Sequence, residues 1–143
     1  MPSFTTQIPD LLNTGPVVDI AVATHPDLLE HLKESGQSIP TPVRALAMID
    51  TGATSTIVKP EIIESLGINP IGEKRISTPS CTDFSCNQYQ ATILFPNRVA
   101  IHISSILEAP LTGQSIQCLI GRDILSRVVF IYNGYANFIT FSI

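Results

Sequence analysis

"ALAMIDTGATSTIV", residues 45–58, places a carboxylate at the end of an apolar run. Ala45 to Ile49 have the character of a buried strand, and Asp50 follows that strand directly. Gly52 gives the backbone conformations closed to other residues, and the Thr51 hydroxyl can hydrogen-bond to a second segment. An isolated Asp-Thr-Gly is most often a turn capped by Asp, but a turn between two buried strands gains little from water. The stretch therefore predicts a carboxylate held rigidly at the tip of a loop.

The composition bounds the kind of protein to which this loop belongs. The chain has 143 residues, of which 44% are hydrophobic and 14% charged, which favours one folded domain over a disordered chain. Such a sparsely charged surface suggests that part of it is covered by a second copy, so we expect a homo-oligomer. The net charge of -4 is spread along the chain and the basic residues form no stripe, which makes nucleic acid an improbable partner.

Targeting signals and cysteines point to a protein of a reducing compartment. The first residues show no basic segment followed by an apolar core, and no apolar run reaches the ~18 residues that cross a bilayer. We therefore expect no membrane partner. Cys81, Cys86 and Cys118 cannot all pair within one chain, whereas secreted disulfide frameworks usually have an even count. The expected location is cytoplasmic.

Prolines and glycines divide the chain into short pieces, most of them β-branched. The patterns predict an all-β domain with one or two short helices, an N-terminal arm over residues 1–15 and a single domain over residues 16–143. Asn133-Gly134 predicts a two-residue type I′ turn between the last two strands. The expected strands are 17–22, 43–49, 55–58, 74–77, 88–95, 99–105, 116–120, 128–132 and 137–143, and the expected helical segments are an insertion at about 25–36, 60–67 and 122–127.

A second motif, "CLIGRDIL" at residues 118–125, follows the first by about seventy residues. Together with "AMIDTGATSTIV" at 47–58 it resembles the two halves of a retropepsin-like aspartic protease, over residues from about 16 to 143. The resemblance implies a closed β-barrel, the acid-protease half, with Asp50 catalytic in the first segment. It also implies that the second segment packs beneath the catalytic loop, with structural support from Ile120, Gly121, Arg122 and Asp123.

Aspartic proteases need two carboxylates that share one proton, because two like charges about 3 Å apart cannot both ionise. This chain has one Asp-Thr-Gly. Asn13-Thr14-Gly15 offers an amide and Leu111-Thr112-Gly113 offers no carboxylate. The dyad must therefore come from Asp50 of two copies in a C2 homodimer, as the resemblance also implies. The expected activity is endopeptidase cleavage of a peptide or protein substrate, without a metal or other cofactor.

The resemblance assigns further roles around the dyad. Thr51 would interlock with its mate in the other subunit, and Gly52 would offer its carbonyl to the substrate. Ala53 stands where pepsin-like enzymes usually have Ser, and without that hydroxyl we expect activity nearer neutral pH; a pH–rate profile peaking below about 3 would contradict this. Three residues take positions that face the side-chain pockets in the family and imply an apolar substrate preference, although a plain core role is favoured for each: Met48, Ile57 and Leu119.

The hairpin at about 74–95 would serve as the flap over the substrate. Its expected tip, residues 78–87, contains no glycine, whereas retroviral flaps are glycine-rich there. The bend and the substrate contacts would fall to Cys81, Thr82, Asp83 and Phe84. This departure keeps a second function open, a dimeric peptide-binding module with little turnover.

Two further features of the sequence depart from the family pattern. Cys81 and Cys86 could form a disulfide or contribute to a metal site, but free thiols are favoured because no further ligand pair lies at zinc spacing. Thr54 and Ser55 occupy the stretch where retroviral enzymes often place an Asp that pairs with the Arg of the Gly-Arg motif. Arg122 is therefore expected to pair with Asp123, Asp19 or a residue of the other subunit.

Overall fold

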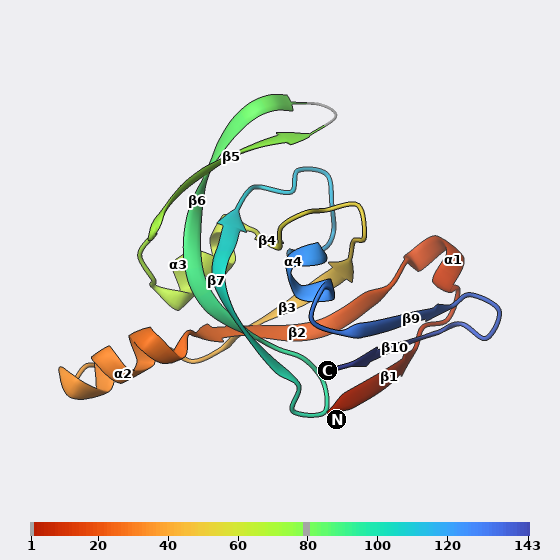
Figure 1. Ribbon diagram of the computed structural model, residues 1–143, viewed down its shortest axis with the longest axis horizontal. Helices are drawn as coiled ribbons and strands as arrows, with labels where there is room; N and C mark the ends of the chain where they lie inside the picture. The colour runs from red at the N-terminus through yellow and green to blue at the C-terminus, as the bar shows by residue number, and fades with distance from the viewer. Residues whose placement is uncertain (1, 79–80) are drawn as a thin grey trace.

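Six strands form a closed mixed barrel in the computed structural model, which describes residues 2–78 and 81–143 (Figure 1). Pairing of β2 (Val17–Thr24) with β6 (Cys81–Leu94) closes the barrel. The pairs β3–β8 and β4–β7 are parallel, and the other pairs are antiparallel. The expected all-β closed barrel is confirmed. In hydrogen-bonded order the strands are β2 (Val17–Thr24), β3 (Val43–Ile49), β8 (Cys118–Ile120), β4 (Ile57–Val58), β7 (Ala100–Glu108) and β6 (Cys81–Leu94).

The barrel interior is filled by alternate residues of these strands. In β2, Val18, Ile20 and Val22 are buried while Asp19 between them is exposed. Successive side chains of a strand point to opposite faces, so this alternation places one face of β2 in the core. The neighbouring β3 buries its residues in the same way, and the core is therefore built from small and β-branched side chains.

The first residues of the chain belong to the fold. β1 (Ser3–Gln7) pairs with β10 (Phe138–Ser142), and β10 pairs with β9 (Val129–Asn133), in a separate three-stranded sheet. Figure 1 shows this sheet beside the barrel with both chain termini next to each other. Phe4 stacks on Phe141 with ring centroids 5.3 Å apart, and Leu11 of α1 (Leu11–Thr14) is buried. The interpretation of residues 1–15 as an arm outside the core was wrong, because this segment supplies a strand and three core residues, Phe4, Ile8 and Leu11.

Three further helices lie where the sequence predicts helical segments. α2 (Pro26–Glu34) buries none of its residues and projects away from the barrel (Figure 1). α3 (Pro60–Leu66) begins with proline, packs Ile62, Ile63 and Leu66 into the core, and ends at Gly67 with φ +68°. α4 (Arg122–Leu125) is a single turn. Among the described residues, no helix has the length and apolar character needed to cross a bilayer.

The hairpin of β5 (Gly72–Thr78) and β6 arches over one end of the barrel (Figure 1). The two strands are paired as far as Thr78 and Cys81, so the expected long connection over residues 78–87 was wrong. Residues 81–85 continue β6 rather than forming a bend. Phe84 and Cys86 are two residues apart in β6, so they share one face of the strand, and both pack against Leu107. This apolar contact explains why the strand continues through a segment whose sequence is mostly polar.

The turn between β9 and β10 also differs from its prediction. Asn133 is the last residue of β9 and pairs with Phe138, so the loop spans residues 134–137 rather than two residues. The Asn133 side chain accepts a hydrogen bond from the Ala136 N–H, 2.9 Å, and the positive φ falls on Asn137, +56°. An asparagine that caps a four-residue loop with its side chain replaces the expected type I′ turn.

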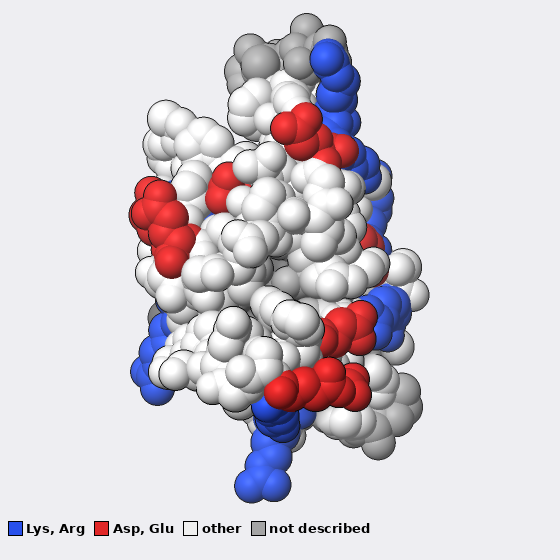
Figure 2. Space-filling view, turned by 90° about the vertical axis from the view of Figure 1, so that its left-hand side faces the viewer, with Lys and Arg blue, Asp and Glu red and all other residues white. Residues whose placement is uncertain are grey.

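Charged side chains are scattered over the surface. On the face shown in Figure 2, acidic and basic groups lie in small clusters, several of them with both signs side by side, among uncharged residues. This distribution agrees with the even spread of charge along the sequence.

Candidate active site

Asp50 lies directly after β3 at the tip of a loop that returns to β4. Its backbone N–H donates to the carbonyl of Ile120, 2.9 Å, and its own carbonyl accepts from the Ala53 N–H, 3.2 Å. The Gly52 N–H donates to Oδ1 of the Asp50 carboxylate, 2.8 Å. Main-chain bonds thus fix both the backbone and the carboxylate, and a hydrogen bond to a charged acceptor is among the stronger ones in proteins.

The two motifs of the sequence meet at this loop. β8 lies between β3 and β4, parallel to the first and antiparallel to the second. Leu119 is opposite Met48 on one side and opposite Ile57 on the other. The second motif therefore lies between the two strands that carry the Asp50 loop, whereas the resemblance implied only that it packs beneath that loop.

Thr56 connects the loop to the second motif, and sequence reasoning missed this residue. Its hydroxyl accepts from the Gly121 N–H, 3.1 Å, and donates to Oδ1 of Asp123, 2.8 Å. The Thr56 N–H donates to the other carboxylate oxygen of Asp123, 2.9 Å. The side chain is fully buried, and a polar group is stable there only when its bonds are satisfied. The one signal in the sequence was a threonine beside the apolar pair Ile57-Val58.

Gly121 is required by the close approach of the two segments. A Cβ at this position would lie 2.6 Å from the carbonyl carbon of Ser55 and 2.7 Å from its oxygen. Its φ of -92° is open to any residue, so space rather than backbone conformation excludes a side chain. The predicted structural role of Gly121 therefore has a direct steric cause.

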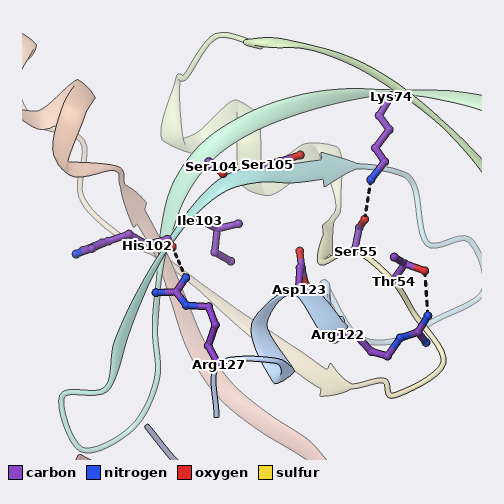
Figure 3. Close-up of a pocket in the computed structure, with 10 residues that line it drawn as sticks. All are labelled: Thr54, Ser55, Lys74, His102, Ile103, Ser104, Ser105, Arg122, Asp123 and Arg127. Carbon is purple, nitrogen blue, oxygen red and sulfur yellow. Dashed lines mark hydrogen bonds between the residues drawn. The ribbon is translucent and has the colours of Figure 1, made fainter.

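Arg122 holds the outer side of the same loop. Its Nη1 donates to the carbonyl of Thr51, 2.7 Å. Its Nη2 donates to the Thr54 hydroxyl, 3.2 Å, as Figure 3 shows. The expected pairing with Asp123 or Asp19 was wrong, because the planar guanidinium spans two oxygens of the loop while the Asp123 carboxylate is occupied by Thr56. Arg122 thus positions the residue that follows Asp50.

A cavity of about 420 Å³ opens beside the Asp50 carboxylate. Ile57 and Leu119 line it, whereas Met48 lies against Gly15 and is not among the lining residues. Phe84 packs with Cys86 and Leu107 instead of facing the cavity. The remaining wall residues come from the loop, from β7 and, unforeseen, from β5: Gly52, Ala53, Thr54, Ser55, Leu107, Lys74, Arg75, Ile76 and Ser77.

The hairpin and the loop approach each other at Lys74 and Ser55. The ammonium of Lys74 lies 3.4 Å from the Ser55 hydroxyl (Figure 3). These two residues and Thr54 also line a second pocket of about 470 Å³, into which Asp123 points and where Arg127 donates to the carbonyl of His102, 2.8 Å. Substrate contacts predicted for Cys81, Thr82 and Asp83 concern side chains that lie outside the described part of the chain.

The cysteines that the structure describes are inert. Cys86 and Cys118 are buried free thiols, and burial is the main cause that raises the pKa of each above its ordinary value. Nearby carboxylates, Glu108 and Asp123 respectively, raise the two pKa values further. Neither thiol therefore has the character of a nucleophile. Within residues 2–78 and 81–143, no group of acidic, His and Cys side chains is arranged to hold a metal ion.

Comparisons with known proteins find a match for the backbone of this chain but none for its sequence. No protein-family model and no curated protein matches the sequence. The structure, however, superposes on the crystal structure of a retropepsin-like aspartic protease from Rickettsia conorii with a TM-score of 0.55, over 97% of this chain and 92% of that one. The chain has a retropepsin-like fold. At 12% identity, the likeness concerns the course of the backbone alone.

Two other structures with a retropepsin-like fold align less closely. The solution structure of the simian foamy virus protease gives a TM-score of 0.49 at 16% identity, over 77% of this chain and 91% of that one. The retroviral protease-like domain of Ddi1 from Leishmania major gives 0.45 at 12% identity, over 82% of each chain. The predicted retropepsin-like fold is confirmed by the first comparison, and the roles of individual residues in this chain rest on its own geometry.

Proposed function

We propose that the protein is an aspartic endopeptidase that hydrolyses peptide bonds between the Asp50 carboxylates of two identical subunits. One observation carries the proposal. The Asp50 carboxylate is fixed by the Gly52 N–H at the mouth of a cavity in a retropepsin-like fold, and each chain supplies one such carboxylate.

The chemistry follows from two carboxylates that share a proton. The ionised Asp50 takes a proton from a bound water as that water attacks the scissile carbonyl. The protonated Asp50 of the partner subunit hydrogen-bonds the carbonyl oxygen and stabilises the charge that develops there. Proton return to the leaving amine completes hydrolysis, and no covalent intermediate is formed.

Residues beside Asp50 support the proposed dyad. Thr51 is exposed, and its hydroxyl makes no hydrogen bond within the described chain, so it is available to its mate across the axis. The Gly52 N–H is already committed to the Asp50 carboxylate, which leaves the Gly52 carbonyl as its main-chain group for a substrate amide. Arg122 holds this turn from the outer side through the Thr51 carbonyl.

The cavity suggests the kind of substrate. Four apolar side chains line its floor and walls: Ile57, Ile76, Leu107 and Leu119. A peptide that places an apolar side chain next to the cleaved bond would bury that side chain there. We also propose a reducing, cytoplasmic setting, which suits the buried free thiols of Cys86 and Cys118.

The replacement Asp50→Asn tests the proposal. The amide is isosteric with the carboxylate but cannot act as the base, so we expect peptide cleavage to fall at least about 1,000-fold. Mass spectrometry of a proteome-derived peptide mixture, incubated with each protein, measures the loss. Asp19→Asn is the matched control, because Asp19 is an exposed carboxylate on β2, outside the cavity.

Cleavage by the Asp50→Asn protein equal to that of wild type would contradict the proposal. If neither protein cleaves while both retain peptides in an equilibrium binding assay, the chain is instead a dimeric peptide-binding module, the second function considered from the sequence. Removal of the carboxylate repulsion should then leave peptide affinity equal or higher.

A further inference from the structure

We propose that the second pocket, of about 470 Å³, takes an acidic side chain of the bound peptide, and that Lys74 binds the carboxylate of that side chain. The inference deepens the proposed function and rests on it, because it names the class of substrate. The expected substrate is a peptide with an apolar residue beside the cleaved bond and an Asp or Glu farther along its chain.

The second pocket adjoins the cavity beside Asp50. Three residues line both spaces: Thr54, Ser55 and Lys74. An extended peptide advances about 3.3 Å per residue, so a peptide that fills the cavity with one side chain can bring a later side chain to the second pocket. The two spaces can therefore bind different side chains of one peptide.

Positive charge predominates in the second pocket. Its walls carry one carboxylate, that of Asp123, and three cationic side chains: Lys74, Arg122 and Arg127. The two oxygens of Asp123 already accept three hydrogen bonds, two of them from Thr56. A concave site in which one sign of charge predominates attracts a ligand group of the opposite sign, so this pocket favours an anionic group.

Lys74 is the least committed cation of the pocket. Arg122 is bonded to the Asp50 loop, and Arg127 is bonded to a carbonyl of β7. The Lys74 ammonium donates to the Ser55 hydroxyl over 3.4 Å, which is long for a hydrogen bond, and no carboxylate among the described side chains forms an ion pair with it. An ammonium group has three donors, so Lys74 can bind a carboxylate of the ligand.

Hydroxyl groups around Lys74 can donate to the same carboxylate. The hydroxyl oxygens of Thr54, Ser55 and Ser105 each accept a hydrogen bond from a neighbouring side chain. Within the described part of the chain, no atom accepts a bond from their O–H groups. Figure 3 shows Lys74 reaching from β5 to Ser55, with Ser105 on β7. Because an ionised carboxylate only accepts hydrogen bonds, this set of donors suits it better than an amide or an ammonium group.

Paired peptides that differ in one charge test the inference. Each probe is a short peptide with a central Leu-Phe pair, in which one position at a time outside that pair carries Glu or its near-isostere Gln. At one position the wild-type protein should cleave the Glu peptide with a kcat/KM about 10-fold above that of the Gln peptide, mainly through a lower KM. Mass spectrometry of the products gives the rates.

Two substitutions of Lys74 assign that preference to this residue. Lys74→Met removes the charge and keeps an unbranched side chain, so the advantage of Glu over Gln should disappear while cleavage of the Gln peptide stays the same. Lys74→Glu should reverse the preference, so that a peptide with Lys at the same position is cleaved faster than the Glu peptide. Lys74 is exposed, and far-UV circular dichroism checks that both variants fold.

Lys33→Glu is the matched control. It makes the same change of charge at an exposed lysine of α2 that lines neither the cavity nor the second pocket, so the preference for Glu should persist. A wild-type protein that does not distinguish Glu from Gln at any position overturns the inference. A preference that is the same in the wild-type, Lys74→Met and Lys74→Glu proteins overturns it as well.

Inorganic phosphate tests whether the pocket holds a free anion instead. Phosphate that raises the melting temperature of the wild-type protein but not of the Lys74→Met protein, without a preference for Glu at any peptide position, overturns the assignment to a peptide side chain.

Binding to the Asp50→Asn protein separates this inference from the proposed activity. Fluorescence anisotropy of the same labelled peptides, with and without the added Lys74→Met change, needs no cleavage. If the wild-type protein cleaves no peptide while the Asp50→Asn protein binds Glu peptides more tightly through Lys74, the pocket assignment stands and the protease proposal fails. If cleavage depends on Asp50 but shows no preference for Glu, the protease proposal stands and this inference fails.

Discussion

At the scale of the residue, the most constrained position beside Asp50 is Gly121. Thr56 and Asp123 draw the second motif against the Asp50 loop through hydrogen bonds of 2.8 to 3.1 Å. This approach leaves no room for a Cβ between Gly121 and the backbone of Ser55. The loop geometry therefore depends on a residue that contributes no side chain of its own.

Gly121→Ala should destabilise the protein by about 3 kcal/mol, because the new methyl group meets main-chain atoms that cannot move aside without shifting the loop. Urea denaturation followed by circular dichroism measures the change. Gly134→Ala is the control: its Cβ would lie 3.2 Å from the exposed Tyr132 ring, which can rotate away. Equal losses for the two variants would argue against a steric role for Gly121.

At the scale of the element, α4 and β1 act on distant parts of the chain. α4 is one turn long, yet its first residue fixes the Asp50 loop by a fork of two hydrogen bonds. β1 packs Phe4 onto Phe141 and Phe95, which joins the two ends of the chain through a stack of rings. Both elements are short, and both are stable because of what they contact rather than because of their own length.

Arg122→Lys should lower kcat/KM by about 10- to 100-fold, since one ammonium cannot bridge the Thr51 carbonyl and the Thr54 hydroxyl as the guanidinium does. The unfolding free energy should change little, because the side chain is exposed. Arg127→Lys is the matched control, with a single bond to the His102 carbonyl. Unchanged cleavage by the Arg122→Lys protein would remove the positioning role.

Phe4→Ala should cost about 3–5 kcal/mol, the range for loss of a buried aromatic side chain. Phe4 is 6% exposed, whereas its neighbour Thr5 is exposed, so Thr5→Ala should have a small effect. Thermal and urea unfolding of both variants compare the two. A Phe4→Ala protein as stable as wild type would indicate that residues 3–7 do not contribute to the stability of the core.

At the scale of the whole molecule, the single chain is half of the proposed enzyme. Its sequence contains one Asp-Thr-Gly, and a cavity lined by described residues lies beside Asp50. Activity and assembly should therefore be inseparable. The low content of charged residues agrees with a chain that covers part of its surface with a second copy in the proposed homodimer.

Excess Asp50→Asn protein should inhibit the wild-type enzyme by forming mixed dimers with one carboxylate. At a fourfold excess, random pairing leaves about one fifth of the wild-type chains in active dimers, so activity should fall about fivefold. Initial rates after equilibration measure the effect. The Asp19→Asn protein, added in the same excess, is the control and should not inhibit, because it keeps the Asp50 carboxylate. Additive rates without inhibition would mean that each chain works alone.

The resemblance to retropepsin-like proteases, rather than any local pattern, implied the closed barrel and the role of the second motif. The sequence by itself determined the β-rich character of the domain, the Asp50 loop and the ends of α3. These features depend on local patterns: β-branched runs, a glycine-containing turn after an apolar strand, and Pro and Gly at the ends of α3. Each is encoded within a few residues, so it can be read without the fold. The proposed need for a second Asp50 also came from the sequence, because the number of Asp-Thr-Gly motifs can be counted there.

Only the tertiary structure decided which residues meet across the chain. Arg122 met a carbonyl and a hydroxyl of the loop rather than a carboxylate, Thr56 became the link between the two motifs, and Phe4 joined the aromatic stack. The long β5–β6 pairing and the asparagine-capped loop before β10 likewise depend on partners distant in sequence or on the register of a neighbouring strand. Each of these side chains has several possible hydrogen-bond or packing partners, and the packing of the whole chain decides which partner it meets. The local sequence does not distinguish between those partners.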